Sequence, residues 1–247
     1  MKGLTDIHCH IIPYVDDGAL RMQEAEELLR MQIDQGVTTV CCTPHLRKNM
    51  FETPDDVIQM QFERLKAWCI QAELPVTLYL SREYHCDELL IKKLEAGQIL
   101  PLGKGKTLLA ELSHRHSEKQ IHEYIRIIKS YGFTPLLAHA ERYEALESTA
   151  SIARLTELGA LIQMNAGSLT GAEGRRQASR CKKLLKEHLI HVIASDAHDP
   201  EERPPELAAC ASILERKFGE EYAAKLLCTN PYQILEDPNG GTDHANG

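Results

Sequence analysis

Short apolar segments alternate with amphipathic segments along the chain. Residues 4–10 form an apolar run with two histidines at its end, which predicts a β-strand. Residues 22–35 then carry apolar side chains at helical spacing, namely Ala25, Leu28, Leu29 and Ile33. Gly36 follows as a helix stop. The chain is therefore expected to begin with a strand followed by a helix.

This strand–helix unit recurs to the end of the chain. Further strands are predicted at residues 37–43, 76–83, 107–113, 133–142, 160–167 and 189–198. Helices are predicted at residues 53–73, 87–97, 118–131, 146–158 and 175–187, and after Pro205. Thr53 is the expected N-cap of the second helix. Such alternation favours an α/β fold whose parallel sheet closes into a barrel, and an open doubly wound sheet is the alternative.

Histidines and carboxylates gather at the predicted ends of these strands. They are His8, His10, His45, Glu83, Glu111, His139, Asp196 and His198. In a parallel barrel the carboxyl ends of the strands converge on one face, so these side chains are expected to meet there. Alternate strand residues share a face, which pairs the two histidines of the first strand and also pairs Asp196 with His198.

This set of donors is typical of a metal centre. Imidazole and carboxylate ligands with no required thiolate suit zinc, manganese or iron, and a carboxylate can bridge two ions. Asp16 and Asp17 add carboxylates from a loop that ends at Gly18. A single buried histidine more often has a structural role, but the whole set favours metal binding. The remaining histidines are interpreted as surface residues or neighbours of the ligands: His85, His114, His116, His122, His188, His191 and His244.

The charge and composition narrow the range of functions. The 247 residues carry a formal net charge of -8, which argues against nucleic-acid binding. No apolar run approaches the length of a membrane span, and the first residues do not resemble a signal peptide. The sequence therefore predicts a cytoplasmic protein that does not insert into a membrane. Its eight cysteines are expected to be reduced.

Residues 1–236 are expected to form a single domain. No linker or long repeat interrupts the alternation of strands and helices. The glycine-rich segment 165–174 matches no phosphate-binding pattern and is interpreted as a turn before a helix. The segment 237–247, rich in Gly, Asn and Asp, is expected to be a disordered tail.

Two cysteine motifs and one basic segment are weaker signals. Cys41 and Arg47 have the spacing of a cysteine-phosphatase loop, but the residues between them include no glycine, and a proline removes one amide. Cys210 and Arg216 show the same spacing inside a predicted helix, so a catalytic cysteine is not expected. The segment 175–186 carries six basic residues, and a solvated helix face is favoured over a docking surface for an acidic partner.

Several of these segments occur together in one known group of proteins. The segments "DIHCH", "DDG", "TPH", "HAERY" and "SDAH" resemble motifs of the polymerase and histidinol phosphatase (PHP) superfamily. With "MFETP" and "RPP", they resemble one branch, the bacterial protein-tyrosine phosphatases of capsule and exopolysaccharide loci. The resemblance covers residues 6–235. It implies a distorted (β/α)7 TIM-like barrel of the PHP type that binds three divalent metal ions. The resemblance favours Mn²⁺ as the metal, with iron or zinc as alternatives.

The resemblance also implies a role for each ligand. The ligands of the first ion would be His8, His10, Glu83 and Asp196. Those of the second would be Glu83, which bridges, with Glu111 and His139. Those of the third would be Asp17, His45 and His198. Asp16 would lie beside them, although the sequence leaves the choice between Asp16 and Asp17 open. Arg142 and Arg203 correspond to phosphate-contacting arginines, whereas Arg82 departs from the family pattern and is expected at the pocket entrance.

The activity that this resemblance implies is hydrolysis of phosphotyrosine by a metal-activated water. The implied partner is the tyrosine-rich tail of a bacterial tyrosine kinase that controls capsular or exopolysaccharide synthesis. Two alternatives stay open: another phosphoesterase of the superfamily, such as a histidinol-phosphate phosphatase, and a catalytically silent metal-binding regulator. The acidic charge disfavours a nuclease. The sequence leaves the oligomeric state open.

Overall fold

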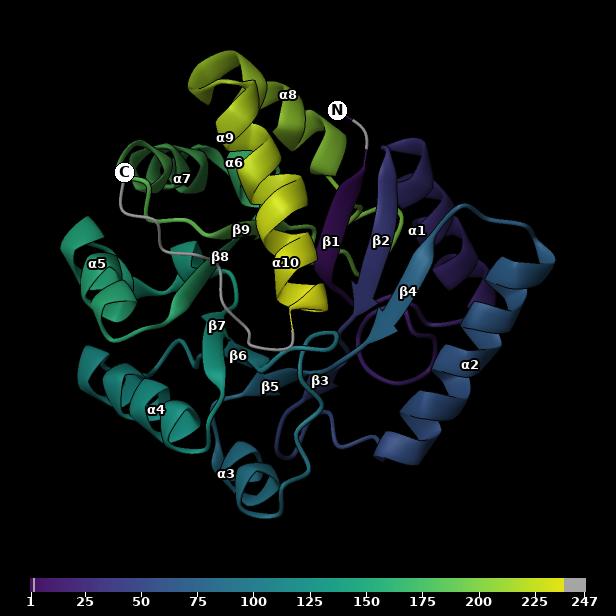
Figure 1. Cartoon of the computed structure of the whole chain (residues 1–247), viewed down its shortest axis with the longest axis horizontal. Helices are drawn as coiled ribbons and strands as arrows, with labels where there is room; N and C mark the ends of the chain where they lie inside the picture. Colours follow the sequence, from purple (N-terminus) through teal and green to yellow (C-terminus); the bar gives the residue numbers. More distant parts are fainter. Residues whose placement is uncertain (2, 238–247) are drawn as a thin grey trace.

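The chain folds into parallel strands surrounded by helices (Figure 1). The computed structural model describes residue 1 and residues 3–237. The strands are β1 (Leu4–Cys9), β2 (Val37–Cys42), β3 (His45–Leu46), β4 (Thr77–Leu80), β5 (Glu83–His85), β6 (Thr107–Glu111), β7 (Thr134–Leu137), β8 (Leu161–Asn165) and β9 (Val192–Ala194).

Helices follow most of these strands. They are α1 (Met22–Asp34), α2 (Asp55–Gln71), α3 (Glu88–Glu95), α4 (Glu118–Ser130), α5 (Thr149–Glu157), α6 (Ala166–Thr170), α7 (Arg175–Lys186), α8 (Leu207–Phe218), α9 (Glu220–Ala224) and α10 (Asn230–Glu236). Shorter helical turns are η1 (Ala140–Arg142), η2 (Glu144–Leu146) and the π-helical η3 (Lys225–Thr229). Among the described residues, no helix has both the length and the apolar character that a membrane crossing requires.

The strands pair into two parallel sheets. One sheet has the order β1-β2-β4 and the other the order β3-β5-β6-β7-β8-β9. Only Thr43 and Pro44 separate β2 from β3, and β4 is joined to β5 by an equally short segment. The chain after β9 lies beside β1, because the amide of Asp196 donates to the carbonyl oxygen of His8 at 2.8 Å. The protein thus has an α/β fold with a curled parallel sheet.

The break between β2 and β3 has a local cause. Pro44 has no amide hydrogen with which to continue a ladder. Thr43 instead pairs with Cys9: its amide donates to the Cys9 carbonyl oxygen at 2.9 Å, and its hydroxyl oxygen accepts from the Cys9 amide at 3.1 Å. The segment therefore belongs to one sheet before the proline and to the other sheet after it.

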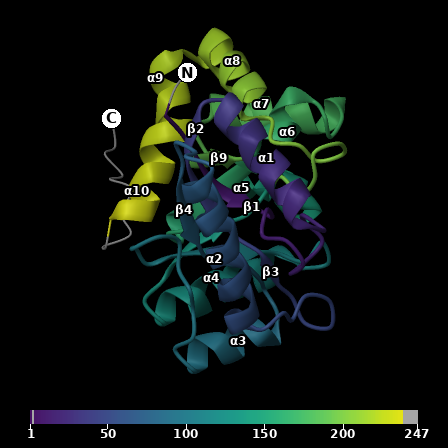
Figure 2. The same ribbon diagram turned by 90° about the vertical axis from the view of Figure 1, so that its right-hand side faces the viewer.

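The helices cover the strands with apolar faces. In α4, Ile121, Ile125 and Ile128 recur at helical spacing and are all buried. A capping box of Ser117 and Gln120 satisfies the first backbone amides of this helix. On another flank, α1 and α2 lie side by side over the first sheet (Figure 2). Amphipathic periodicity is therefore the main reason that these segments surround the sheets.

Helix α10 packs at the amino ends of the strands. Its residues Ile234 and Leu235 join an apolar cluster with Leu102 and Leu109, and all four are fully buried. The amide of Lys104 donates to the carbonyl oxygen of Leu235 at 2.7 Å, which ties the end of the helix to the loop before β6. This end of the sheet is thus closed by apolar packing.

Three local predictions differ from the structure. Thr53 does not cap α2, because Pro54 occupies the cap position and the Thr53 hydroxyl donates to the carbonyl oxygen of Val15 at 2.6 Å. The strand expected at 133–142 ends at Leu137. The segment 165–174, interpreted as a turn, contains the short helix α6. In each case a contact or a backbone conformation at the carboxyl end of the strands overrides the local pattern.

Candidate metal centre

The histidines and carboxylates come together where β1, β6, β7 and β9 end and where the short strands β3 and β5 begin, at His45 and Glu83. The group comprises His8, His10, His45, Glu83, Glu111, His139, Asp196 and His198. Two of its members, His139 and Asp196, have left-handed backbones with φ of 33° and 54°. Residues other than glycine seldom adopt this conformation, and it costs about 1–3 kcal/mol where it occurs. The fold thus tolerates strain at these two ligand-type residues, each of which lies two residues after the end of its strand, β7 or β9.

Four ligand-type atoms face one point. His8 Nε2 lies 3.2 Å from His10 Nε2, 3.3 Å from Glu83 Oε2 and 3.4 Å from Asp196 Oδ1. His10 Nε2 lies 3.3 Å and 3.6 Å from the same two oxygens. Ligands about 2.0–2.1 Å from a tetrahedral ion are about 3.3 Å apart. The four atoms therefore have the spacing of ligands around one divalent ion.

Glu83 connects this point to a second group. Its Oε1 lies 3.0 Å from His139 Nε2, and its Oε2 lies 2.9 Å from His45 Nδ1. Glu111 Oε2 lies 4.0 Å from His45 Nδ1 and 2.8 Å from His85 Nδ1. One ligand atom each of His45, Glu83 and Glu111 falls within 4.8 Å of the others. Glu83 thus has an oxygen available to each group, as a bridging carboxylate requires.

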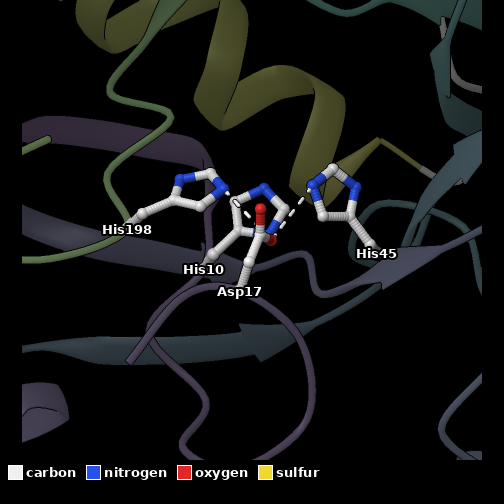
Figure 3. Close-up of side chains that lie close together, drawn as sticks. All are labelled: His10, Asp17, His45 and His198. Atoms are coloured by element: carbon white, nitrogen blue, oxygen red, sulfur yellow. Dashed lines mark ion pairs between the residues drawn. The ribbon is translucent and has the colours of Figure 1, made fainter. Parts of the chain in front are cut away.

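A third group lies at the loop after β1. Asp17 Oδ1 lies 3.6 Å from His45 Nε2 and 3.7 Å from His198 Nε2. Figure 3 shows the Asp17 carboxylate between these two rings, in front of the His10 ring. Ligand atoms of all four residues fall within 4.8 Å of one another. The expected trio of Asp17, His45 and His198 therefore comes together, with His10 as an additional neighbour.

Asp16 and Asp17 have different surroundings. The buried Asp16 carboxylate accepts from His10 Nδ1 at 2.7 Å, from the His45 amide at 2.9 Å and from the Gly18 amide at 3.1 Å. Burial opposes its ionisation, but His10 outweighs burial and lowers the pKa of Asp16. The Asp17 side chain is 48% exposed and faces the third group. Asp16 therefore orients the loop and the ligands, and Asp17 is the carboxylate that is free to bind.

Gly18 is required by the close approach of this loop to β1. A Cβ atom at this position would collide with the carbonyl oxygen and Cβ of His10. The amide of Ala19 donates to that same carbonyl oxygen at 3.0 Å. The glycine thus allows the loop to fold back over the strand and present Asp17 to the third group.

Asp196 links the centre to the two arginines. Its Oδ2 accepts from Arg142 Nη1 at 2.9 Å, from Arg203 Nη2 at 2.9 Å and from Asn165 Nδ2 at 2.7 Å. Its Oδ1 is the oxygen that faces the two histidines of β1. Arg142 also forms a bidentate pair with Glu173, with N–O distances of 2.9 Å and 2.8 Å. A cavity of about 80 Å³ is lined by both arginines and by Asp196.

Several buried polar atoms of the centre have no hydrogen-bond partner within the described chain. They are Glu83 Oε2, His45 Nδ1 and His198 Nε2. The first two lie 2.9 Å apart as an ion pair that does not meet hydrogen-bond geometry. A buried polar atom without a hydrogen bond costs about 1–3 kcal/mol, so this cluster needs an explanation. Divalent cations would satisfy these atoms, because each is an imidazole nitrogen or a carboxylate oxygen of the groups above. The residues of the centre therefore fit bound metal ions.

The charges of the centre favour cations in the same way. Burial lowers the pKa of His8, but Glu83 and Asp196 outweigh it and raise that pKa to about 9. Glu83 likewise overcomes burial at His45 and raises its pKa to about 10. Burial and the neighbouring His10 lower the pKa of His198 to about 2, so this ring is neutral and keeps a lone pair for a ligand role. The carboxylates thus attract positive charge to the centre.

The cysteine motifs are inert in the structure. Cys41 lies in β2 with its side chain fully buried, and burial raises the pKa of its thiol well above the ordinary value. Cys210 is buried in α8, where burial also raises the pKa of its thiol. A thiol needs a lowered pKa and access to substrate to act as a nucleophile. Neither cysteine meets these conditions.

The expectation that Arg82 lies at a pocket entrance is wrong. Its side chain is only 3% exposed and donates to the carbonyl oxygen of His45, to the Thr53 carbonyl oxygen at 3.1 Å and to Asp55 Oδ1 at 2.6 Å. The residue belongs to the short segment between β4 and β5, which turns it inward. Arg82 therefore fixes the backbone of His45 and does not contact the cavity.

A family model matches nearly the whole chain. The family described as "Capsular polysaccharide synthesis, CpsB/CapC" matches residues 4–236. The chain belongs to the CpsB/CapC family. This confirms the resemblance to the phosphatase branch of the PHP superfamily.

Individual relatives of this CpsB/CapC protein agree with the family match. It is 33% identical over 240 residues to the tyrosine-protein phosphatase CpsB of Streptococcus pneumoniae, covering 95% of this chain and 99% of the relative. It is also similar to a solved structure from a study of YwqE from Bacillus subtilis and CpsB from Streptococcus pneumoniae, which are described there as unique metal-dependent tyrosine phosphatases. That match has a TM-score of 0.88 and 28% identity, and it covers 96% of each chain.

A more distant structure shows the fold alone. The phosphotriesterase homology protein of Escherichia coli matches this CpsB/CapC chain with a TM-score of 0.64 and 11% identity, over 95% of this chain and 99% of the other. The expected α/β fold related to TIM-like barrels is thereby confirmed at this coarser level.

Some residues of this CpsB/CapC centre were missed by sequence reasoning. Gln163 Oε1 lies 3.2 Å from His8 Nδ1 and accepts from the His139 amide at 2.7 Å. Tyr143 OH lies 3.0 Å from His139 Nδ1. Such partners orient metal ligands. The two amide side chains of the buried strand β8, Gln163 and Asn165, were a signal for this role, whereas Glu173 lies in a loop and offered none.

The remaining histidines fall into different places. His85, beside Glu111, is a neighbour of the ligands, whereas His114 and His188 are exposed. His116 is partly buried, and its ring lies 6.4 Å from that of His85. His244 lies outside the described residues. His122 is half-buried beside Glu118, and His191 is half-buried before β9, where its Nδ1 accepts from the Ile162 amide at 3.1 Å. The interpretation of these histidines as surface residues or neighbours of the ligands therefore fits His85, His114 and His188, but not His191.

Proposed function

We propose that this CpsB/CapC protein hydrolyses the phosphate ester of phosphotyrosine at the carboxyl ends of its strands. One observation carries this proposal: two arginines meet on one oxygen of Asp196 while its other oxygen faces His8 and His10. A phosphate in the adjacent cavity would therefore lie between guanidinium groups and metal ligands. This is the arrangement that phosphoryl transfer requires, because charge accumulates on the phosphoryl oxygens.

We further propose that the centre binds three divalent ions. We expect Mn²⁺, with iron or zinc as alternatives. The first would be held by His8, His10, Glu83 and Asp196. The second would be held by Glu83, Glu111 and His139, with His45 close to it. The third would be held by Asp17, His45 and His198, with His10 close to it. The spacing of these atoms and the unpartnered nitrogens and oxygens support the assignment.

The metal ligands and the arginines would have different roles in the reaction. When bound, the ions would stabilise charge on phosphoryl oxygens and supply a water of lowered pKa. Arg142 and Arg203 would bind the phosphate, because the planar guanidinium fork matches its oxygens. Glu173 binds the guanidinium of Arg142 in the same bidentate way, so an incoming phosphate would displace the Glu173 carboxylate. Phenolate is a good leaving group, and no covalent intermediate on the protein is needed.

The barrel and its domain limits are part of the proposal. We assign β2 with β3, and β4 with β5, to single strand positions of a distorted (β/α)7 barrel, because each pair is one extended segment with a short break. The bridge between Cys9 and Ala197 supports closure of this barrel between its first and last strands. We assign residues 1–236 to this single domain. The tail predicted at 237–247 lies outside the described residues from 238 onward.

The proposed substrate is the phosphorylated tyrosine-rich tail of a tyrosine kinase that controls capsular or exopolysaccharide synthesis, in the cytoplasm. The family's connection with capsular polysaccharide synthesis supports it. Histidinol phosphate is the alternative substrate, and a silent regulator is the alternative function. Comparison of kcat/KM for a phosphotyrosyl peptide with that for histidinol phosphate separates the substrates, and turnover of either excludes a silent regulator.

The test is phosphate release from a phosphotyrosyl peptide by three samples. One sample is stripped with a chelator, one is stripped and reloaded with Mn²⁺, and one is treated with a thiol alkylator. We expect activity to vanish on stripping, to return with Mn²⁺ and to resist alkylation, since every candidate cysteine is buried. Activity that survives stripping and is lost on alkylation would contradict the proposal.

A further inference from the structure

A basic groove beside the centre carries a further inference, which rests on the proposed function. We propose that this groove binds a second anionic group of the substrate, next to the phosphotyrosine in the same peptide segment. The groove lies between α7 and the segment that contains η1 and η2. The basic segment 175–186, interpreted from the sequence as a solvated helix face, would then be in part a binding surface for substrate.

The groove is continuous with the proposed phosphate site. Its volume is about 490 Å³; its cations are Arg142, Arg176, Arg180 and Lys183, and its carboxylates are Glu144 and Glu147, so the cations outnumber the carboxylates. Arg142 also lines the small cavity beside Asp196, so one guanidinium is shared by the two hollows. A peptide whose phosphate contacts Arg142 therefore has its neighbouring residues at the mouth of the groove.

Two of the four cations have no carboxylate partner within the described chain. Arg142 pairs with Glu173, and Arg176 pairs with Glu147 at 2.8 Å. Arg180 instead donates to the backbone carbonyl oxygens of residues 143 and 146, and its buried Nε has no partner. Lys183 is exposed and forms no ion pair with a described residue. Positive charge thus remains uncompensated in the groove, and an anion would compensate it.

Another hollow beside the centre has the opposite charge. A second hollow of about 470 Å³ is lined by Asp17 and by the carboxylates of Glu24, Glu27, Asp199, Glu201 and Glu202. Arg21 also lies there, but it pairs with Glu24. An anionic group next to the phosphotyrosine would be repelled on this flank and attracted on the α7 flank. Of these two hollows, the charges therefore favour the groove beside α7 for the second anion.

A carboxylate and a second phosphate share the chemistry that this groove would recognise. Guanidinium and ammonium groups bind both, and phosphate carries more charge. Five peptides of equal length, each with one reacting phosphotyrosine, distinguish these two anions. The first peptide has only neutral residues beside the phosphotyrosine. Two peptides carry a pair of glutamates, one before and one after the phosphotyrosine, and the last two carry a non-hydrolysable phosphotyrosine analogue in the same two places.

The test compares the ratio of kcat/KM for each anionic peptide to that for the neutral peptide. In the wild-type protein we expect a ratio of about five for the better-placed anion, mainly through KM, and we expect high salt to reduce it. The double variant Arg176→Gln/Lys183→Gln should bring the ratio close to one. The control Arg175→Gln/Lys182→Gln removes the same charge from α7 outside the groove and should keep the wild-type ratio.

Each outcome bears on the proposal. A ratio raised by the glutamates identifies a carboxylate as sufficient, and a ratio raised only by the phosphotyrosine analogue identifies phosphate. A wild-type ratio of one with every anionic peptide would overturn the groove proposal while leaving the proposed activity intact. So would an equal loss of the ratio in the two double variants, which would point to net charge alone. If no peptide is turned over, both proposals fail.

Discussion

The same strands build two ends of opposite chemistry. At the amino end, Leu102, Leu109 and Leu235 form a buried apolar cluster that α10 closes. At the carboxyl end, Glu83 and His45 are also buried, and their Oε2 and Nδ1 atoms form an ion pair at 2.9 Å without hydrogen-bond geometry. Apolar burial at the first end stabilises the fold, whereas desolvation of charged groups at the second costs free energy. The carboxyl end is therefore the part of the fold where binding groups are kept at a cost in stability.

The backbone shows the same contrast. At the amino end several left-handed positions are glycines, such as Gly103 with φ of 59°, although Glu73 and His188 also have positive φ in the turns before β4 and β9. At the carboxyl end the left-handed positions include His139 and Asp196, where the side chain is required. The two ligand residues thus have a strained backbone conformation that fixes where their side chains point.

Removing the bridging charge should have the largest effect. We expect Glu83→Gln to lower kcat/KM on a phosphotyrosyl peptide at least about 100-fold, because the amide cannot replace a carboxylate that faces two groups of ligands. Elemental analysis should show fewer bound metal ions, and circular dichroism should show an intact fold. Wild-type activity and metal content in this variant would contradict the bridging role.

Removing a phosphate-binding charge should affect activity without loss of metal. We expect Arg203→Ala to lower kcat/KM about 10- to 100-fold, because one donor to the phosphoryl oxygens is lost while Arg142 and Asn165 still hold Asp196. Elemental analysis should give the wild-type metal content. Loss of the metal ions in this variant would show that the arginine supports the ligands instead of the substrate.

Two glycines allow a matched test of the two ends. A Cβ at Gly18 would collide with the His10 carbonyl oxygen, and one at Gly103 would collide with the Leu235 carbonyl oxygen. We expect Gly18→Ala to lower activity about tenfold with loss of metal, and Gly103→Ala to lower the free energy of unfolding by about 1–3 kcal/mol. Enzyme assays and urea unfolding measure the two effects. The same response in both variants would remove the distinction between the ends.

Truncation in the apolar cluster should change stability alone. We expect Leu235→Ala to lower the free energy of unfolding by about 3 kcal/mol, since the buried side chain leaves a cavity. Urea unfolding measures this change. The kcat/KM per folded molecule should stay at the wild-type value, and a large fall would mean that α10 also positions the centre.

The metal should reverse the dependence of stability on pH. The folded pKa values of His8 and His45, about 9 and about 10, lie above the unfolded value of 6.5. Their contribution to stability is therefore complete below pH 6.5 and is lost as the pH rises toward 9–10. In metal-free protein this loss is up to about 1.4 kcal/mol per pH unit for each ring. Bound metal requires deprotonated ligands, so metal-loaded protein should gain stability over pH 6–8.

Thermal unfolding with and without metal, at several pH values, measures this difference. A fall of the melting temperature with pH in both samples would contradict the account, because it would mean that the rings bind protons and not metal.

The periodic parts of the fold were predictable from the sequence. The helix expected at 118–131 is α4, Glu118–Ser130, because its apolar residues and its cap are local signals. The break at Pro44 and the end of β7 depend on contacts between strands, which a local pattern does not contain. The burial of Arg82 has the same cause, since Asp55 and the His45 carbonyl oxygen come from distant parts of the chain.

The ligand-type residues were recognisable because several strands each end in one. Their grouping was less predictable. His45 lies close to two groups, since its Nδ1 faces Glu83 and its Nε2 faces Asp17. The pairing of Arg142 with Glu173 depends on the conformation of the loop before α7. No periodic pattern in the sequence predicts that conformation.

The number of metal ions bound per chain tests the central claim most directly. The measurement is elemental mass spectrometry of the full-length protein after gel filtration in a buffer that contains Mn²⁺. The account predicts three ions per chain in the wild-type protein and fewer in Glu83→Gln. At most one ion per wild-type chain, with full activity on a phosphotyrosyl peptide, would contradict it, because the histidines and carboxylates would then lack the role proposed for them.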